Sequence, residues 1–176
     1  MRKRLTALML GLLLLTACSG GGTIQPYAKA ATDPGYFTGL WAHLAARLQL
    51  EAAKPVFLKE FTLAFDAGGT LQSGKLELVA TGRDSKLHQI QVDAAGGKWR
   101  RTEVPVKATA ADVTPGEAVF RRLDQAAWSD LLQRLGQPSQ VTIRLTPDRK
   151  CAVSVEGGGR RWPIDTCAPA VALLQP

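Results

Sequence analysis

The sequence contains few of the residues from which catalytic and metal sites are usually built. Its 176 residues include two histidines, His43 and His88, and three cysteines. Neither histidine stands at a metal-ligand spacing from another His, Cys or Glu, and no G-x-S-x-G segment exposes a nucleophilic serine. The glycine-rich segments EGGGR and DAGGT lack the Lys-Ser/Thr ending of a phosphate-binding loop. We therefore expect no catalytic site, no metal and no cofactor.

The sequence also lacks an apolar run long enough to cross a membrane. Its most apolar run, from Leu5 to Leu15, has about eleven residues, whereas a membrane helix needs about 20. Three basic residues, Arg2, Lys3 and Arg4, precede this run, and the order is typical of a secretory signal peptide. We therefore expect the protein to be exported.

The predicted signal peptide ends in Leu15-Thr16-Ala17-Cys18, where small residues lead directly into a cysteine. This segment resembles the lipobox of bacterial lipoproteins. The resemblance implies cleavage between Ala17 and Cys18, a diacylglycerol on the Cys18 thiol and a further acyl chain, such as palmitate, on its amine. Two or three acyl chains make such an attachment effectively permanent. Ser19 stands where an Asp would indicate the inner membrane, so the resemblance favours the periplasmic side of the outer membrane.

The alternative to a lipobox is an ordinary cleaved signal peptide followed by an incidental free cysteine.

The net charge of the chain bears on the kind of partner that it binds. The net charge of +7 becomes about +4 when Arg2, Lys3 and Arg4 leave with the signal peptide. Such a modest excess in an exported protein indicates no nucleic-acid partner, and it is compatible with an anionic lipid surface.

Lipidation of Cys18 would leave two cysteines, Cys151 and Cys167. They flank the segment AVSVEGGGRRWPIDT, which is typical of a β-hairpin with its turn at Gly157–Gly159. The far ends of such a hairpin meet, and exported proteins keep disulfides. A Cys151–Cys167 bridge closing a loop of about 15 residues would stabilise the fold by about 3 kcal/mol. The alternative, a redox-active pair, has no C-x-x-C motif to favour it.

The segment Ser19–Thr32 is small, polar and interrupted by Gly and Pro, so it is predicted to be a linker with a reach of about 20 Å. The chain then divides into a cleaved signal peptide over 1–17, a lipidated flexible tether over 18–32 and a single α+β domain over 33–176.

The domain is predicted to begin with a helix capped by Asp33, with Pro34 in the first helical position. The helix carries apolar residues at helical spacing, namely Phe37, Leu40, Trp41, Leu44 and Leu48. Four strand-like segments follow, VFLKEFTLAFDA, TLQSGKLELVATG, KLHQIQVDAAGG and KWRRTEVPVKA. Gly68-Gly69 and Gly96-Gly97 predict hairpin turns, and a shift in alternation near Lys59 predicts a bulge. We expect an antiparallel meander.

A second helix is predicted from a capping box formed by Thr114, Pro115 and Glu117. Its buried stripe would comprise Phe120, Leu123, Ala127, Leu131 and Leu135. The alternating segment QVTIRLT and the cysteine-flanked hairpin follow, with Pro163 confining the last strand to an edge. The predicted fold is therefore an α+β domain in which an antiparallel sheet of about seven strands packs against two amphipathic helices, in the order α-ββββ-α-βββ.

Two helical segments share the pattern W-x-x-L-x-x-R-L, beginning at Trp41 and Trp128. One interpretation is an internal duplication of an α–β unit. The alternative is chance similarity between two amphipathic helices in a chain rich in Ala, Leu and Arg.

Basic residues flank tryptophan in two strand segments, KWRR and RRW. Their residues are Lys98, Trp99, Arg100 and Arg101 in the first, and Arg160, Arg161 and Trp162 in the second. If both strands ended on one side of the sheet, they would form a basic–aromatic patch suited to a protein or an acidic envelope polymer. The alternative is that each tryptophan points into the core and the arginines are solvated.

These features predict a non-enzymatic cell-envelope lipoprotein that binds or helps to assemble another envelope protein. The competing hypothesis is a carrier of lipid or a small ligand, with an apolar pocket between the sheet and the helices. An enzyme has no motif to support it.

Overall fold

The computed structural model describes residues 20–48, 56–81, 87–103, 114–145 and 152–165. Its helices are α1 (Tyr36–Arg47), α2 (Gly116–Asp124) and α3 (Trp128–Leu135). Its strands are β1 (Gly21–Thr23), β2 (Val56–Asp66), β3 (Leu71–Thr81), β4 (Leu87–Asp93), β5 (Lys98–Glu103), β6 (Thr114–Pro115), β7 (Gln140–Leu145), β8 (Ala152–Gly157) and β9 (Arg160–Asp165). The α+β class is confirmed.

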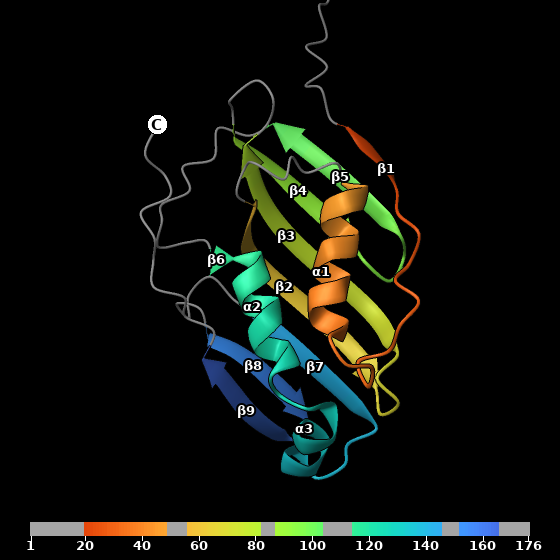
Figure 1. The fold of residues 1–176 in the computed structure, drawn as a ribbon, viewed down its shortest axis with the longest axis vertical. Coiled ribbons are helices and arrows are strands. Elements are labelled where there is room, and N and C mark those ends of the chain that lie inside the picture. Colours follow the sequence, from red (N-terminus) through yellow and green to blue (C-terminus); the bar gives the residue numbers. More distant parts are fainter. Residues whose placement is uncertain (1–19, 49–55, 82–86, 104–113, 146–151, 166–176) are drawn as a thin grey trace, which may run out of the picture.

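The strands form one antiparallel sheet in the order β1-β5-β4-β3-β2-β7-β8-β9, and the short β6 pairs with β2 (Figure 1). The predicted meander of β2 to β5 is confirmed, as is the edge position of β9. In the part of the chain that is described, the sheet has nine strands and three helices cover it, against the seven and two expected.

Figure 1 shows α1 and α2 in front of the sheet and α3 beside its lower end, so the helices lie on one face. Aromatic rings join these layers. Trp41 of α1 and Phe61 of β2 both stack on Phe120 of α2, with ring centroids 5.5 and 5.7 Å apart. Phe65 of β2 meets Trp128 of α3 edge-on at 5.3 Å. Such pairs add about 0.5–1.5 kcal/mol each to the burial of their surface.

The irregularities of the meander follow the sequence. The β2–β3 register shifts between Leu58 and Glu60, which confirms the predicted bulge. Gly69 and Gly97 have positive φ angles of 80° and 65° and lie in the turns after β2 and β4. Both hairpin turns are thus confirmed, and both need a residue that tolerates the left-handed conformation.

The start of α1 differs from the prediction. The helix begins at Tyr36 after the left-handed Gly35, and Asp33 does not cap it. Asp33 instead closes the preceding turn, because its carboxylate accepts the N–H of Ala30 and its carbonyl accepts the N–H of Tyr36.

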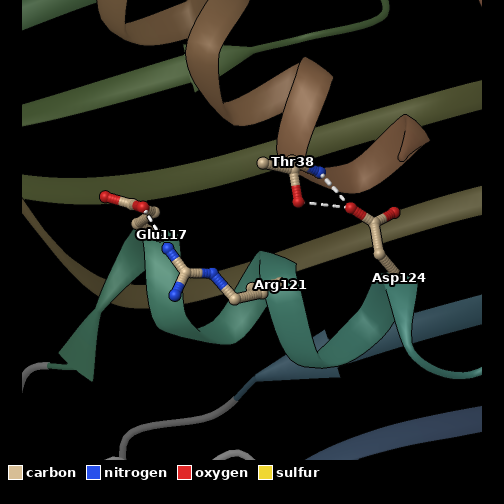
Figure 2. Close-up of polar contacts among 4 residues, drawn as sticks. All are labelled: Thr38, Glu117, Arg121 and Asp124. Atoms are coloured by element: carbon tan, nitrogen blue, oxygen red, sulfur yellow. Dashed lines mark hydrogen bonds and ion pairs between the residues drawn. The ribbon is translucent and has the colours of Figure 1, made fainter.

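The cap of α1 comes from α2. The N–H groups of Phe37 and Thr38 donate to the Asp124 carboxylate at 2.9 and 2.8 Å, and the Thr38 hydroxyl donates to it as well (Figure 2). Asp124 is the last residue of α2. This carboxylate therefore joins the beginning of one helix to the end of another.

The single second helix predicted from the apolar stripe is wrong, because α2 ends at Asp124 and α3 begins at Trp128. The predicted capping box is also not formed. Thr114 and Pro115 pair with β2 as β6, and Glu117 forms an ion pair with Arg121 at 2.5 Å (Figure 2). The break allows Trp128 to turn inward, where its indole N–H donates to the carbonyl of Ala67 at 3.2 Å.

Residues 20–31 do not form the free linker that their composition predicts. We call this segment the N-terminal strap. Its first part, β1, pairs with β5, and further on the N–H of Ile24 donates to Gly97 at 2.8 Å and that of Ala31 to Gly69 at 2.7 Å. Ile24 and Ala31 are both buried. Burial of these apolar side chains, together with the backbone bonds, offsets the entropy lost on ordering the strap.

The strap also crosses α1. The ring of Tyr27 lies 5.5 Å from that of Tyr36 and 5.4 Å from that of His43. Gly39 makes room for it, since a Cβ there would lie 2.0 Å from the Tyr27 hydroxyl oxygen. The Nε2 of His43 donates to the carbonyl of Gln25 at 2.7 Å. His43 is therefore a structural residue that holds the strap in place.

Candidate binding groove

One face of the meander carries polar residues in two rows that cross its four strands. Leu76, Leu78 and Val92 point into the helix-covered core, so the residues that alternate with them lie on the opposite, open face. The first row pairs Thr62, Lys75, Asp93 and Lys98 across β2, β3, β4 and β5. The second row pairs Glu60, Glu77, Gln91 and Arg100 across the same strands.

These two rows line a groove of about 700 Å³, which is the candidate functional site. Between the rows the groove is bounded by Phe61, Leu76, Val92, Trp99 and Leu145, which contribute strand backbone there because their side chains point to the helix side. The groove has a size that suits a bound group, and its two rows place charged groups of both signs along it.

The acidic groups of the groove are partly engaged within the protein. Glu77 is largely buried, and its carboxylate pairs with the Nζ of Lys59 at 2.5 Å. The Asp93 carboxylate accepts the N–H of Gly96 at 2.8 Å in the following turn. Three cations, Lys75, Lys98 and Arg100, are exposed on the same face. The groove therefore offers positive charge on the β3 and β5 side and the exposed carboxylate of Glu60 on the β2 side.

The structure does not bring the two predicted basic–aromatic runs together. β5 and β9 are separated by β4, β3, β2, β7 and β8 in the sheet order, so no single patch forms. Within the β5 run, Lys98 and Arg100 belong to the groove. Trp99 and Arg101 alternate with them and face the helix side, where Trp99 packs half-buried against the core.

The β9 run is engaged in local contacts. Trp162 is 40% exposed, and the guanidinium of Arg134 in α3 lies 4.2 Å from its ring centroid. Arg160 donates to the carbonyl of Arg134 at 3.4 Å, and Arg161 lies 3.6 Å from the carboxylate of Glu156. These residues connect α3 to the edge of the sheet.

The side chains of His88 and Tyr36 lie in the protein interior. His88 is buried on the helix side of β4. The Tyr36 hydroxyl is buried as well, and this burial, with a smaller contribution from Tyr27, raises its pKa above the ordinary value of 10.0.

Over the described ranges, no group of three or more His, Cys, Asp or Glu side chains could hold a metal ion. In those ranges no helix combines the length and the apolar character that spanning a bilayer requires.

The predicted cysteine sites lie outside the described residues. This applies to Ala17 and Cys18 of the lipobox and to the Cys151–Cys167 disulfide. The hairpin between the last two cysteines is confirmed: β8 pairs with β9 from Ala152 opposite Asp165 to Gly157 opposite Arg160.

Comparison with protein-family models, with curated proteins and with solved structures gives no match. The groove is not among the sites that the sequence predicts. The segments KLEL and QIQVD do carry its signal, because a polar residue stands at every second position in each.

Proposed function

We propose that the chain is a cell-envelope lipoprotein, anchored through Cys18, whose domain binds another envelope protein without catalysis. The lipobox supports the anchor and, through Ser19, favours the periplasmic side of the outer membrane. The groove on the open face would receive the partner. Under this proposal the anchor keeps the domain at the membrane, where its partner is found.

The groove is the observation that carries the binding role. It carries charges of both signs in two fixed rows across four strands. Complementary charge patterns between protein surfaces give specificity and fast association. A partner surface with acidic groups over Lys98 and Arg100, and a basic group near Glu60, fits this pattern.

The carrier hypothesis has less support. It needs an apolar pocket between the sheet and the helices. At that interface Tyr36, Phe61, Phe65 and Phe120 are each less than 2% exposed and pack against one another. The groove lies on the other face of the sheet.

Site-specific photo-crosslinking tests the binding role. A photoreactive residue replaces Gln91 in the groove, and a matched control replaces Gln133, which is exposed on α3. After irradiation of intact envelopes, we expect a discrete protein adduct from position 91 that Lys98→Glu together with Arg100→Glu abolishes. Equal adducts from both positions, or adducts insensitive to the charge reversal, would contradict the proposal.

The anchor is tested separately by mass spectrometry of the mature protein. We expect an N-terminus at Cys18 that carries the mass of a diacylglycerol and of an amide-linked acyl chain. A free Cys18 thiol, or an N-terminus elsewhere, would show that the signal peptide is of the ordinary kind.

We also infer that the chain contains two α–β units, one comprising α1 and β2–β5 and the other α2, α3 and β7–β9. In support, β2 and β7, the first long strand of each unit, pair side by side and antiparallel. The two W-x-x-L-x-x-R-L segments differ in placement, because Trp41 lies within α1 whereas Trp128 begins α3. The duplication stays a prediction.

A further inference from the structure

The N-terminal strap leaves almost no free chain between the predicted lipid anchor and the folded domain. The carbonyl of Gly20 accepts the N–H of Arg101 at 2.6 Å, and the next residue begins β1. A single residue, Ser19, stands between Cys18 and Gly20. Since one residue spans at most about 3.6 Å, the acylated cysteine lies within about 7 Å of Gly20, rather than at the end of a 20 Å tether.

The topology defines which end of the domain this is. β1 runs antiparallel to β5, so Gly20 lies beside Arg101, near the end of β5. α1 starts close to the opposite end, where the strap residue Ala31 bonds to Gly69 in the β2–β3 turn. Figure 1 shows α1 rising from there toward the end of the sheet at which β1 begins. We call this end of the domain, which carries Gly20, the last turn of α1 and the end of β5 at Glu103, the anchor end.

Exposed basic side chains lie at or beside the anchor end. Arg47 is exposed in the last turn of α1, and Arg100 is exposed on β5. Arg101 lies beside Gly20 and is half-buried. Anionic headgroups attract basic side chains within a Debye length of the membrane surface, and a cysteine held within 7 Å of Gly20 brings these side chains into that range.

We propose that the anchor end lies directly against an anionic bilayer, so that the domain has a fixed orientation at the membrane instead of moving freely on a tether. The groove then lies on a side wall of the domain, and the row that contains Arg100 is nearer the bilayer than the row that contains Lys98. This inference rests on the proposed anchoring through Cys18.

Fluorescence quenching of the acylated full-length protein tests this orientation. The protein is reconstituted in phosphatidylcholine vesicles with about a quarter phosphatidylglycerol and a headgroup-attached quencher. A fluorescent amino acid replaces Ala46, in the last turn of α1, or Gln133, in α3 near the opposite end; both residues are exposed. We expect quenching at position 46 to exceed that at position 133 at least threefold.

Two variants make the test decisive. Insertion of a flexible Gly/Ser spacer of about twelve residues between Ser19 and Gly20 should reduce the quenching at position 46 to the level of position 133. Phosphatidylglycerol should increase the quenching at position 46 relative to phosphatidylcholine alone. Arg47→Gln should remove much of this increase, because one basic residue near an anionic surface strengthens the local association about fivefold.

The outcomes separate the orientation from the anchor. If mass spectrometry finds the acyl chains on Cys18 but both labels are quenched equally, or the spacer has no effect, the fixed orientation is overturned and the anchor stands. If no acyl chain is found, the anchor and the orientation both fail.

Discussion

The carboxylate of Asp124 satisfies backbone N–H groups 86 and 87 residues earlier in the chain. It ends α2, it caps α1, and it holds these two helices at a fixed spacing above the sheet. A local cap is usually within three residues of the N–H group that it accepts, so no sequence pattern around Thr38 indicates this partner.

Replacement of Asp124 by Ala should therefore cost more than a surface substitution. We expect Asp124→Ala to lower the free energy of unfolding by about 2 kcal/mol, because two N–H groups and a hydroxyl lose a charged acceptor. Urea denaturation measures this change. The control is Asp130→Ala, which removes an exposed carboxylate from α3 and should change stability by less than about 0.5 kcal/mol. Equal effects of the two substitutions would contradict the capping role.

Tyr36 gives a pH-dependent prediction. Its hydroxyl is buried and has no hydrogen-bond partner within the described residues, and burial raises its pKa above 10.0. Above pH 10 the unfolded chain releases this proton while the folded chain keeps it. The free energy of unfolding should thus be unaffected by this group below pH 10, and should fall above it by about 1.4 kcal/mol per pH unit.

The variant Tyr36→Phe should lack this alkaline loss. At neutral pH it should be as stable as the parent protein or more stable by about 1 kcal/mol, because an unpartnered buried hydroxyl is removed. Urea denaturation between pH 7 and 11 compares the two proteins. A destabilised variant at pH 7 would mean that the hydroxyl has a partner.

At the scale of elements, the strap depends on a glycine of α1. We expect Gly39→Ala to displace Tyr27, because the new Cβ would lie 2.0 Å from its hydroxyl oxygen. Amide hydrogen exchange should then accelerate at Ile24 and Ala31, while the β3 amides remain protected. In a Tyr27→Ala background the same substitution should instead stabilise α1 by about 1 kcal/mol, since Ala is the better helix former. Destabilisation in both backgrounds would contradict the clash.

The β8–β9 hairpin is the element on which the predicted Cys151–Cys167 disulfide acts. We expect reductant to lower the free energy of unfolding by about 3 kcal/mol. A double variant, Cys151→Ser with Cys167→Ser, is the control and should show no response to reductant. A response of the same size in the control would exclude the disulfide as its cause.

The elements differ in how far the sequence predicts them. Strict alternation in QVTIRL and the glycine turns determine strands and hairpins locally, so β2–β5 and β7–β9 are predictable. The strap is not, since its Gly- and Pro-containing composition is that of a linker, and only the contacts of Ile24 and Tyr27 with distant residues order it. The break before Trp128 also depends on a distant group, the carbonyl of Ala67.

At the scale of the whole molecule, the strand order could not be obtained from local pattern. The pairing of β2 with β7 connects residues about eighty positions apart, such as Phe61 and Leu145, and it places the two basic–aromatic runs of β5 and β9 toward opposite edges of the sheet. The groove depends instead on the register of the β2–β5 meander, because each row forms only when four strands align residues such as Glu60, Glu77, Gln91 and Arg100.

The pairing of β1 has a consequence for the order of events during maturation. If the chain is anchored as proposed, a peptidase that cuts before Cys18 has to reach a bond two residues away from Gly20, and the docked strap would hinder its approach. β1 contributes only three residue pairs to the sheet, so this edge can open at little cost in free energy. We therefore expect processing to precede docking: the rest of the domain folds while the strap is still free, and closure of β1 onto β5 is the last step of its assembly.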